Sequence, residues 1–246
     1  MLQTDSCYYI FIVNETKGSD VVAKVHPKPI EGTLRKFSLR VPEVIRECSG
    51  ITVFGKRIKS LVFSTDVAII KNVNADAVIA VYPFTPQPVI TQAILQVSDI
   101  PVFVGVGGGL TKGQRVLSLA EFAEMQGAMG VVLNAPVSNE VVSGVSQTVD
   151  IPTVVTIVRE DEDVDARIEA GASILNVSGA SKTADIVRKI REKHHDIPII
   201  ATGGPTDESI RATIEAGANA ITWTPPSNGE IFKDIMAAYR NGQPHP

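Results

Sequence analysis

The sequence predicts an α/β protein of the (β/α)8 TIM-barrel class, and internal repetition is the main observation behind that prediction. The string Asp-Ile-Pro followed by an apolar run occurs three times, starting at Asp99, Asp150 and Asp196. Between these segments the chain passes three times from a helical pattern through Gly-Ala into another apolar run. Regular alternation of strand and helix is typical of a parallel sheet. A chain of 246 residues fits closure into a barrel, which needs about 200 to 250 residues.

Eight short runs rich in Val and Ile are the predicted strands, and a helical pattern follows each one. Strands buried on both faces of a parallel sheet show such continuous apolar runs. We expect the glycine of each Gly-Ala step to end a helix and the proline of each Asp-Ile-Pro to begin a strand. An open doubly wound sheet is the alternative, but the regular repeat favours closure. The predicted strands are residues 60–65, 77–82, 101–106, 130–134, 153–158, 173–178, 198–202 and 220–224.

Residues 1–50 do not fit the repeat, so we interpret them as an N-terminal extension of a barrel that spans residues 51–246. Within the extension, residues 8–13 and 21–25 are typical of a β-hairpin. A short helix is expected over residues 41–48, with a proline at its start. The extension could plug the bottom of the barrel or pair with another subunit, and the sequence leaves both open.

Composition indicates an ordinary globular protein and excludes several partners. Hydrophobic residues make up 44% of the chain and charged residues 20%, and the net charge is −4. Such a chain is not expected to attract nucleic acid or an anionic membrane. Residues 1–5 do not show the basic region typical of a secretory signal, and no apolar run reaches the roughly 18 residues that span a bilayer. Cys7 and Cys48 form no metal or redox motif. We therefore expect a cytoplasmic protein that binds a small molecule without a metal or cofactor, with homo-oligomers left open.

Candidate catalytic residues lie where predicted strands end, because ligands of such barrels bind at the C-terminal ends of the strands. Asp66 is the one carboxylate at a predicted strand end on the inward parity, so it is the first candidate for an acid or base. Lys182 follows the sixth strand, where it could form a Schiff base, pair with an anion, or lie in solvent. Asn134 and Asn176 share the inward parity and are candidates for orienting polar groups, since asparagine otherwise disfavours strands.

A phosphate site is predicted where the last two strands end. Gly203 and Gly204 follow the seventh strand, and Thr224 and Ser227 follow the eighth. Exposed main-chain N–H groups beside the N-terminus of a helix form the usual phosphate cradle of these barrels. Ser227 could instead cap its helix, which is the commoner role for serine at that position.

A third glycine-rich segment follows the third strand. Leu110 stands where the dinucleotide-binding pattern requires a glycine, and the segment also departs from the nucleoside-triphosphate pattern. We interpret it as a loop or lid at the barrel mouth, with a solvated loop as the alternative. Its candidate residues are Gly107, Gly108, Gly109 and Lys112.

Several motifs together resemble a group of bacterial TIM-barrel proteins that are often labelled "hydrolase" without an established activity. The resemblance covers about residues 40–240. It is carried by Gly-Lys-Arg-Ile-Lys-Ser at 55–60, Ser-Thr-Asp-Val-Ala at 64–68, Tyr-Pro-Phe-Thr-Pro-Gln-Pro at 82–88, residues 105–109, Leu-Asn-Ala-Pro at 133–136, Leu-Asn-Val-Ser-Gly at 175–179 and Ala-Thr-Gly-Gly-Pro-Thr at 201–206.

More distantly, the second half is similar to the ribulose-phosphate-binding barrel superfamily, which includes indole-glycerol-phosphate synthase, thiazole synthase and keto-deoxy-phosphogluconate aldolase. That similarity implies phosphate binding at Gly203, Gly204 and residues 224–227. It implies no catalytic residues for this chain, because the catalytic acid and lysine of those enzymes have no secure match in its sequence.

We therefore favour an enzyme that acts on a small phosphorylated metabolite as a lyase (aldolase-type), isomerase or cyclase. A hydrolase, as the group's label suggests, is a weaker alternative because the sequence assembles no histidine-based triad, zinc set or Gly-x-Ser-x-Gly motif. A ligand-sensing regulator resembling the glycerol-operon antiterminators is the other alternative. It would need a basic RNA-binding surface, for which two clusters around residues 35–40 and 56–59 are the candidates.

Overall fold

The computed structural model describes residues 27, 28, 30, 32 and 38–245. The chain divides into two units, Met1–Lys36 and Phe37–Pro246, and the first lies almost wholly outside the described residues. The hairpin expected over residues 8–25 lies outside them too. The predicted domain boundary at residue 50 stays a prediction.

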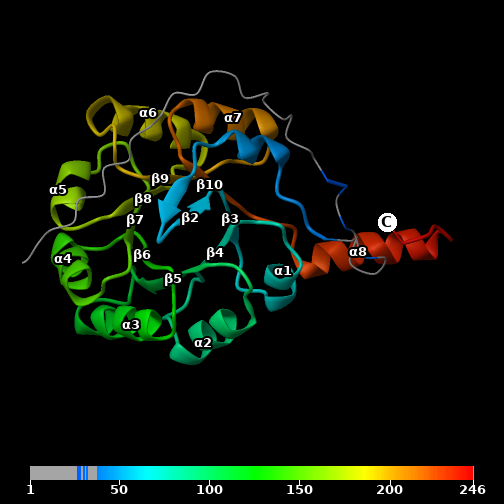
Figure 1. Cartoon of the computed structure of the whole chain (residues 1–246), viewed down its shortest axis with the longest axis horizontal. Coiled ribbons are helices and arrows are strands. Elements are labelled where there is room, and N and C mark those ends of the chain that lie inside the picture. The colour runs from blue at the N-terminus through cyan, green and yellow to red at the C-terminus, as the bar shows by residue number, and fades with distance from the viewer. Residues whose placement is uncertain (1–26, 29, 31, 33–37, 246) are drawn as a thin grey trace, which may run out of the picture. The chain divides into compact units, whose positions relative to one another are not determined.

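The second unit is a closed barrel of eight parallel strands (Figure 1). The strands follow one another around the barrel in chain order, and the last pairs with the first. This arrangement confirms the (β/α)8 class and each predicted strand, and it excludes the open sheet. The strands are β3 (Ser60–Phe63), β4 (Ala77–Ala80), β5 (Val102–Gly107), β6 (Gly130–Leu133), β7 (Thr153–Ile157), β8 (Ile174–Val177), β9 (Ile199–Thr202) and β10 (Ala220–Trp223).

A helix follows each strand of the barrel. The expected helix ends are confirmed at Gly127, Gly171 and Gly217, whose φ angles of +87°, +105° and +111° are ones that glycine adopts readily. None of the described helices is both long and apolar enough to cross a membrane. The helices are α1 (Val67–Lys71), α2 (Pro88–Val97), α3 (Gln114–Met125), α4 (Asn139–Thr148), α5 (Val164–Glu169), α6 (Thr183–Lys193) after the 3-10 turn η2 (Ala180–Lys182), α7 (Asp207–Glu215) and α8 (Asn228–Arg240).

Two apolar layers hold the barrel, because successive residues of each strand point to opposite faces. One layer lies between the strands and the surrounding helices, and includes Val62, Leu133 and Ile221. The other fills the barrel lumen. It contains Leu61, Ala77, Ile79, Phe103, Val132, Val154, Ile174, Ile200 and Ala220.

A β-hairpin closes the N-terminal end of the lumen. It consists of β1 (Ile51–Val53) and β2 (Lys56–Ile58), which pair antiparallel. Three of its side chains, Ile51, Val53 and Ile58, belong to the lumenal cluster. Figure 1 shows the hairpin lying across the middle of the ring of strands. The segment that plugs the barrel therefore lies at 51–58, just after the extension for which a plug was one of two alternatives.

The short helix expected over residues 41–48 is present as the 3-10 helix η1 (Glu43–Glu47), which starts after Pro42. Its Val44 and Ile45 are buried in the outer apolar layer. Glu47 pairs with Arg211 of α7 at 2.9 Å. Helix α8, by contrast, has no buried residue, and Figure 1 shows it extending away from the ring of helices.

The hairpin plug leads to a stability prediction. Ile58→Ala removes a side chain that is only 2% exposed in the lumenal cluster, so we expect it to lower the free energy of unfolding by about 2–5 kcal/mol. Lys56→Ala, on the same strand but exposed, is the matched control and should change it by less than about 0.5 kcal/mol. Urea unfolding followed by circular dichroism measures both, and equal effects would contradict the plug.

Candidate functional site

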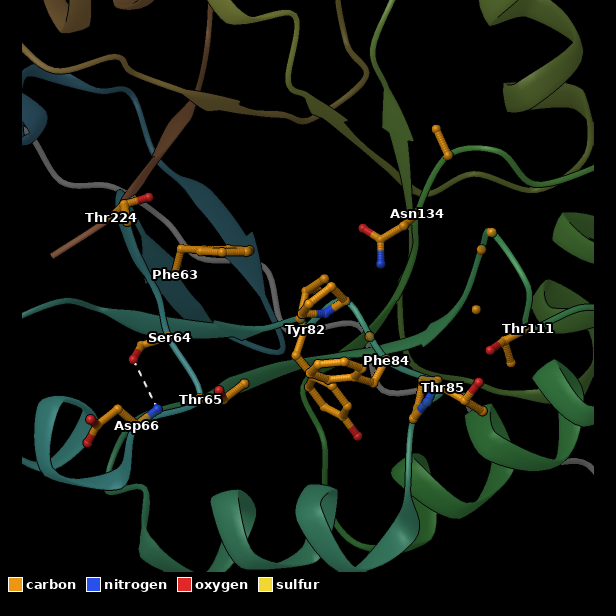
Figure 2. Close-up of a pocket in the computed structure, with 18 of the residues that line it drawn as sticks. Phe63, Ser64, Thr65, Asp66, Tyr82, Phe84, Thr85, Thr111, Asn134 and Thr224 are labelled. Atoms are coloured by element: carbon orange, nitrogen blue, oxygen red, sulfur yellow. Dashed lines mark hydrogen bonds between the residues drawn. The ribbon is translucent and has the colours of Figure 1, made fainter. Parts of the chain in front are cut away.

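A cavity of about 970 Å³ opens at the C-terminal ends of the strands, opposite the hairpin plug (Figure 2). Its wall comes from the loops after β3, β4, β5, β6 and β10, so it joins the beginning, middle and end of the barrel. The lining residues are 63–66, 69, 81–86, 105, 107–111, 134–135 and 224–227.

The cavity wall is mainly aromatic, aliphatic or neutral and polar. Phe63, Tyr82 and Phe84 supply rings, while hydroxyl groups come from Ser, Thr and Tyr side chains. Among the described residues that line the cavity, Asp66 is the one charged side chain. A ligand held here therefore meets hydrogen-bonding groups and one carboxylate, and a negatively charged ligand would depend on main-chain N–H groups.

Asp66 links the first and last units of the barrel. One carboxylate oxygen caps α1 by accepting from the N–H groups of Ala68 and Ile69, at 2.9 and 3.3 Å. The other accepts from the Asn228 side-chain amide at 2.6 Å. The Asp66 N–H in turn donates to the Ser64 hydroxyl at 3.1 Å (Figure 2). The expected acid or base thus lies in the cavity wall, in a fixed position, and also has a structural role. The inward parity expected for it is wrong, because Leu61 faces the lumen and Val62 the outer layer; Asp66 reaches the cavity from the loop after β3.

Asn134, Thr156 and Asn176 form a hydrogen-bonded chain across three neighbouring strands. The Thr156 hydroxyl accepts from the Asn176 side-chain nitrogen at 3.1 Å and donates to the Asn134 side-chain oxygen at 3.4 Å. Because the Asn134 oxygen faces Thr156, its amide nitrogen is left for the cavity, and Figure 2 shows it pointing inward from β6. These two hydrogen bonds set the orientation of the Asn134 amide, which presents its nitrogen as a donor to a ligand.

Two buried polar atoms of the lumen have no hydrogen-bond partner among the described residues: the side-chain oxygens of Asn176 and Thr222. The two residues are only 7% and 6% exposed. Leaving such a group unpaired costs about 1–3 kcal/mol. Unpaired oxygens at this depth therefore need an explanation beyond packing.

The residues of the predicted phosphate cradle divide between packing and the cavity. A Cβ on Gly203 would come within 2.8 Å of both Ile210 and Ile221, so this glycine allows α7 to pack against β10. Gly204 is exposed with φ +87°, and its N–H has no partner among the described residues. Thr224 lines the cavity, as does Ser227.

Ser227 also caps α8 in a reciprocal capping box with Glu230. The Glu230 carboxylate accepts from the Ser227 N–H and hydroxyl at 2.8 and 2.7 Å. These bonds hold the pKa of the Glu230 carboxyl below its usual value. One donor of the expected cradle is therefore already bound to an internal carboxylate.

Lys182 does not lie among the residues that line the cavity. Its side chain is 67% exposed and its ammonium pairs with Glu160 at 3.1 Å. Lys112, also exposed, follows the cavity residue Thr111. The structure thus brings Asp66, Asn134, Thr224, Ser227 and residues 107–109 together, and leaves Asn176, Lys182, Gly203, Gly204 and Lys112 outside the cavity wall.

The predicted lid segment is held in place by its own hydrogen bonds. Gly108 and Thr111 exchange two main-chain bonds of 3.1 Å, and the Gly109 N–H donates to the Pro136 carbonyl at the same distance. A Cβ on Gly108, whose φ is +117°, would collide with the Asn134 carbonyl. Glycine is required there by the close approach of two backbones. Movement of this segment as a lid stays a prediction.

The aromatic part of the cavity was not among the predicted site residues. Phe63 ends β3 on the inward parity, and Tyr82 and Phe84 belong to the segment 82–88 that also carries the family resemblance. The Tyr82 hydroxyl accepts from the Gln87 N–H at 2.8 Å. A proline-rich segment directly after a predicted strand was the signal that could have identified these residues.

The described residues offer neither a reactive thiol nor a metal site. Cys48 is buried in the outer layer, and burial raises the pKa of its thiol to about 11. The described residues contain no cluster of three His, Cys, Asp or Glu side chains arranged to hold a metal ion.

Comparisons with known proteins identify the fold. No protein-family model matches the chain, and no curated protein does. Among solved structures, the 4-hydroxy-tetrahydrodipicolinate synthase of Methylacidiphilum fumariolicum SolV is 15% identical with a TM-score of 0.55, covering 75% of this chain and 74% of that one. A phosphonopyruvate hydrolase in complex with oxalate and Mg²⁺ is 13% identical with a TM-score of 0.56, covering 75% and 83%.

A mandelate oxidase is 16% identical with a TM-score of 0.58, covering 72% of this chain and 68% of that one. The chain shares their TIM barrel. At these identities the likeness establishes the fold alone, and these neighbours are enzymes.

The double role of Asp66 gives a testable prediction. Asp66→Ala removes the cap of α1 and the bond to Asn228, so it should lower the free energy of unfolding by about 0.5–2 kcal/mol. Asp66→Asn, the matched control, keeps a side-chain oxygen for the cap and should lose clearly less. Urea denaturation compares the two, and equal losses would show that the cap does not contribute.

Proposed function

We propose that this chain is an enzyme of lyase, isomerase or cyclase type that acts on a small phosphorylated metabolite bound in the mouth cavity. The observation that carries this proposal is that Asp66 and the Asn134 amide nitrogen both belong to the wall of one cavity, on opposite sides of it (Figure 2). A carboxylate and a fixed neutral donor are the groups needed to move a proton next to a carbonyl. The family resemblance supplies the phosphorylated substrate class.

Asp66 is the proposed base. Three hydrogen bonds fix its carboxylate, and a carboxylate has about four acceptor positions, so one remains for a substrate proton. Asn134 is the proposed donor to the substrate oxygen that becomes negative as the proton leaves. Because its orientation is set through Thr156, no rearrangement is needed during the reaction.

Main-chain N–H groups are the proposed phosphate ligands, since the described cavity wall has no cation. The Gly204 N–H and the first-turn N–H groups of α8, at Asn228 and Gly229, have no partner among the described residues. Such groups bind anions together with the helix dipole. Pro225 and Pro226 contribute no donors, and the Ser227 N–H is bound to Glu230. The proposed cradle is therefore Gly204 with Asn228 and Gly229. None of the three lines the cavity, so the phosphate would lie at its rim.

The phosphate cradle can be tested at Gly229. Gly229→Pro removes one N–H at a first-turn position that tolerates proline, and we expect the affinity for inorganic phosphate to fall about tenfold. Gly229→Ala is the matched control, because the nearest atom to an added Cβ is 3.9 Å away. Calorimetric titration measures both. A wild-type crystal soaked in sulfate with no anion at this corner would remove phosphate from the proposal.

The proposed base has a kinetic test that needs no knowledge of the final product. NMR follows solvent deuterium exchange at the carbon next to the carbonyl of dihydroxyacetone phosphate and ribulose 5-phosphate. Where wild type catalyses exchange, Asp66→Asn should slow it by about 10²- to 10⁴-fold. Exchange that Asp66→Asn leaves unchanged would assign the proton transfer to another group.

The Schiff-base role predicted for Lys182 is tested separately. Because its ammonium pairs with Glu160 outside the cavity wall, we expect borohydride with the same two carbonyl phosphates to leave this lysine unmodified. Peptide mass spectrometry locates any adduct. A reduced adduct on Lys182 that is absent from Lys182→Arg would restore the lysine to the mechanism.

A further inference from the structure

We propose that the barrel lumen below the mouth, at Asn176 and Thr222, is a subsite for an uncharged, hydroxyl-bearing part of the substrate. The proposal rests on the proposed function, which it deepens: the phosphate would stay at the rim, and a polyol-like segment would enter the lumen. The two buried oxygens without partners are the observation behind it.

The position of these two residues follows from the strand register. Asn176 lies two residues after Ile174, and Thr222 two residues after Ala220, and both of these earlier residues belong to the lumenal cluster. Residues two apart on a strand share a face. Asn176 and Thr222 therefore point into the lumen, on the mouth side of its apolar filling, and both are more than nine-tenths buried.

The same rule defines a polar wall on one half of the lumen. On each of the five neighbouring strands β6 to β10, the chain has one residue in the lumenal cluster whose second neighbour toward the mouth is neutral and polar. On the other three strands, β3 to β5, the residue two positions after the lumenal one is Phe63, Val81 or Gly105. The polar residues are Asn134, Thr156, Asn176, Thr202 and Thr222.

This pattern selects an uncharged group. A phosphate or carboxylate moved to this depth would lose its water without meeting a cation, which is unfavourable. A segment with one polar edge and one apolar face would instead fit between the two halves. The lumen thus favours a different part of the substrate from the one at the rim.

The bonding state of Asn176 narrows the chemistry further. Its nitrogen donates to Thr156, so the free oxygen only accepts, and the group that meets it has to donate. The Thr222 hydroxyl both donates and accepts. An alcohol group can donate to Asn176 or accept from Thr222, which makes hydroxyls the simplest complement.

Hydrogen bonds connect the mouth cavity to this subsite. Asn134 lines the cavity and bonds to Thr156, which bonds to Asn176. Phe63 also lines the cavity, and Figure 2 shows its ring projecting from β3 toward the centre of the mouth. A chain of carbons could lie along Phe63 while its hydroxyls replace the missing partners of the polar wall.

The first test measures the protein without ligand. Thr222→Val replaces an unpaired hydroxyl by a methyl group of similar shape, so it should keep or raise the midpoint of thermal unfolding. Asn176→Leu also removes the bond to Thr156, so it serves only the binding tests. Thr213→Val is the matched control, because this buried hydroxyl of α7 has a partner at 2.9 Å, the Ser209 carbonyl. The control should lower the midpoint. A Thr222→Val variant that loses as much as the control would overturn the proposal, since its hydroxyl would then be satisfied.

The second test measures binding with three probes: ribitol 5-phosphate, pentyl phosphate and inorganic phosphate. Wild type should prefer ribitol 5-phosphate over pentyl phosphate, and each lumenal variant should reduce that preference about tenfold. The affinity for inorganic phosphate should stay unchanged in both variants. A preference that survives in Asn176→Leu and Thr222→Val would overturn the subsite and leave the proposed function intact.

Uncharged ribitol separates failure of the subsite from failure of the proposed function. If none of the phosphates binds, the phosphorylated-metabolite proposal fails. The subsite then stands only if ribitol raises the unfolding midpoint of wild type and not that of Asn176→Leu. A crystal soaked in ribitol that shows only ordered water on Asn176 and Thr222 would overturn it.

Discussion

Closure of eight parallel strands into a barrel is the constraint on which the rest of this structure depends. Closure turns every second residue of each strand into a lumen that only side chains can fill. At the base, Leu61, Phe103 and the hairpin residue Ile58 fill it with apolar groups. Two residues further along each strand, the wall of β6 to β10 is polar, and packing alone leaves two of its oxygens without partners. The lumen therefore changes character along its axis.

Closure also brings together segments that lie far apart in the sequence. Because β10 pairs with β3, the loop after the last strand lies beside the loop after the first. Asp66 and Asn228, which are 162 positions apart, become hydrogen-bonded neighbours at the mouth. The same side chain caps α1 and lines the cavity, so the geometry of the site and the stability of the barrel depend on one carboxylate.

The electrostatics of the mouth are unusual for the anion site that we propose. The described wall has one carboxylate and no cation, and the N-terminus of α8 already carries the Glu230 carboxylate in its capping box. Recognition must then come from main-chain dipoles, neutral amides and hydroxyls. Such groups discriminate by direction and by whether each donor finds an acceptor, which suits a substrate with several neutral polar groups.

The sequence by itself determined the fold, because apolar runs, Gly-Ala helix ends and Asp-Ile-Pro strand starts are local features that repeat. Parity along the strands also placed Asn134 and Thr224 at the mouth, whereas Asp66 lines it from the loop after β3. Only the tertiary structure showed that Gly203 serves packing against Ile210, that Lys182 pairs with Glu160, and that a hairpin at 51–58 closes the barrel. These are contacts through space, which depend on how the strands are staggered around the barrel, and a linear pattern does not encode that stagger.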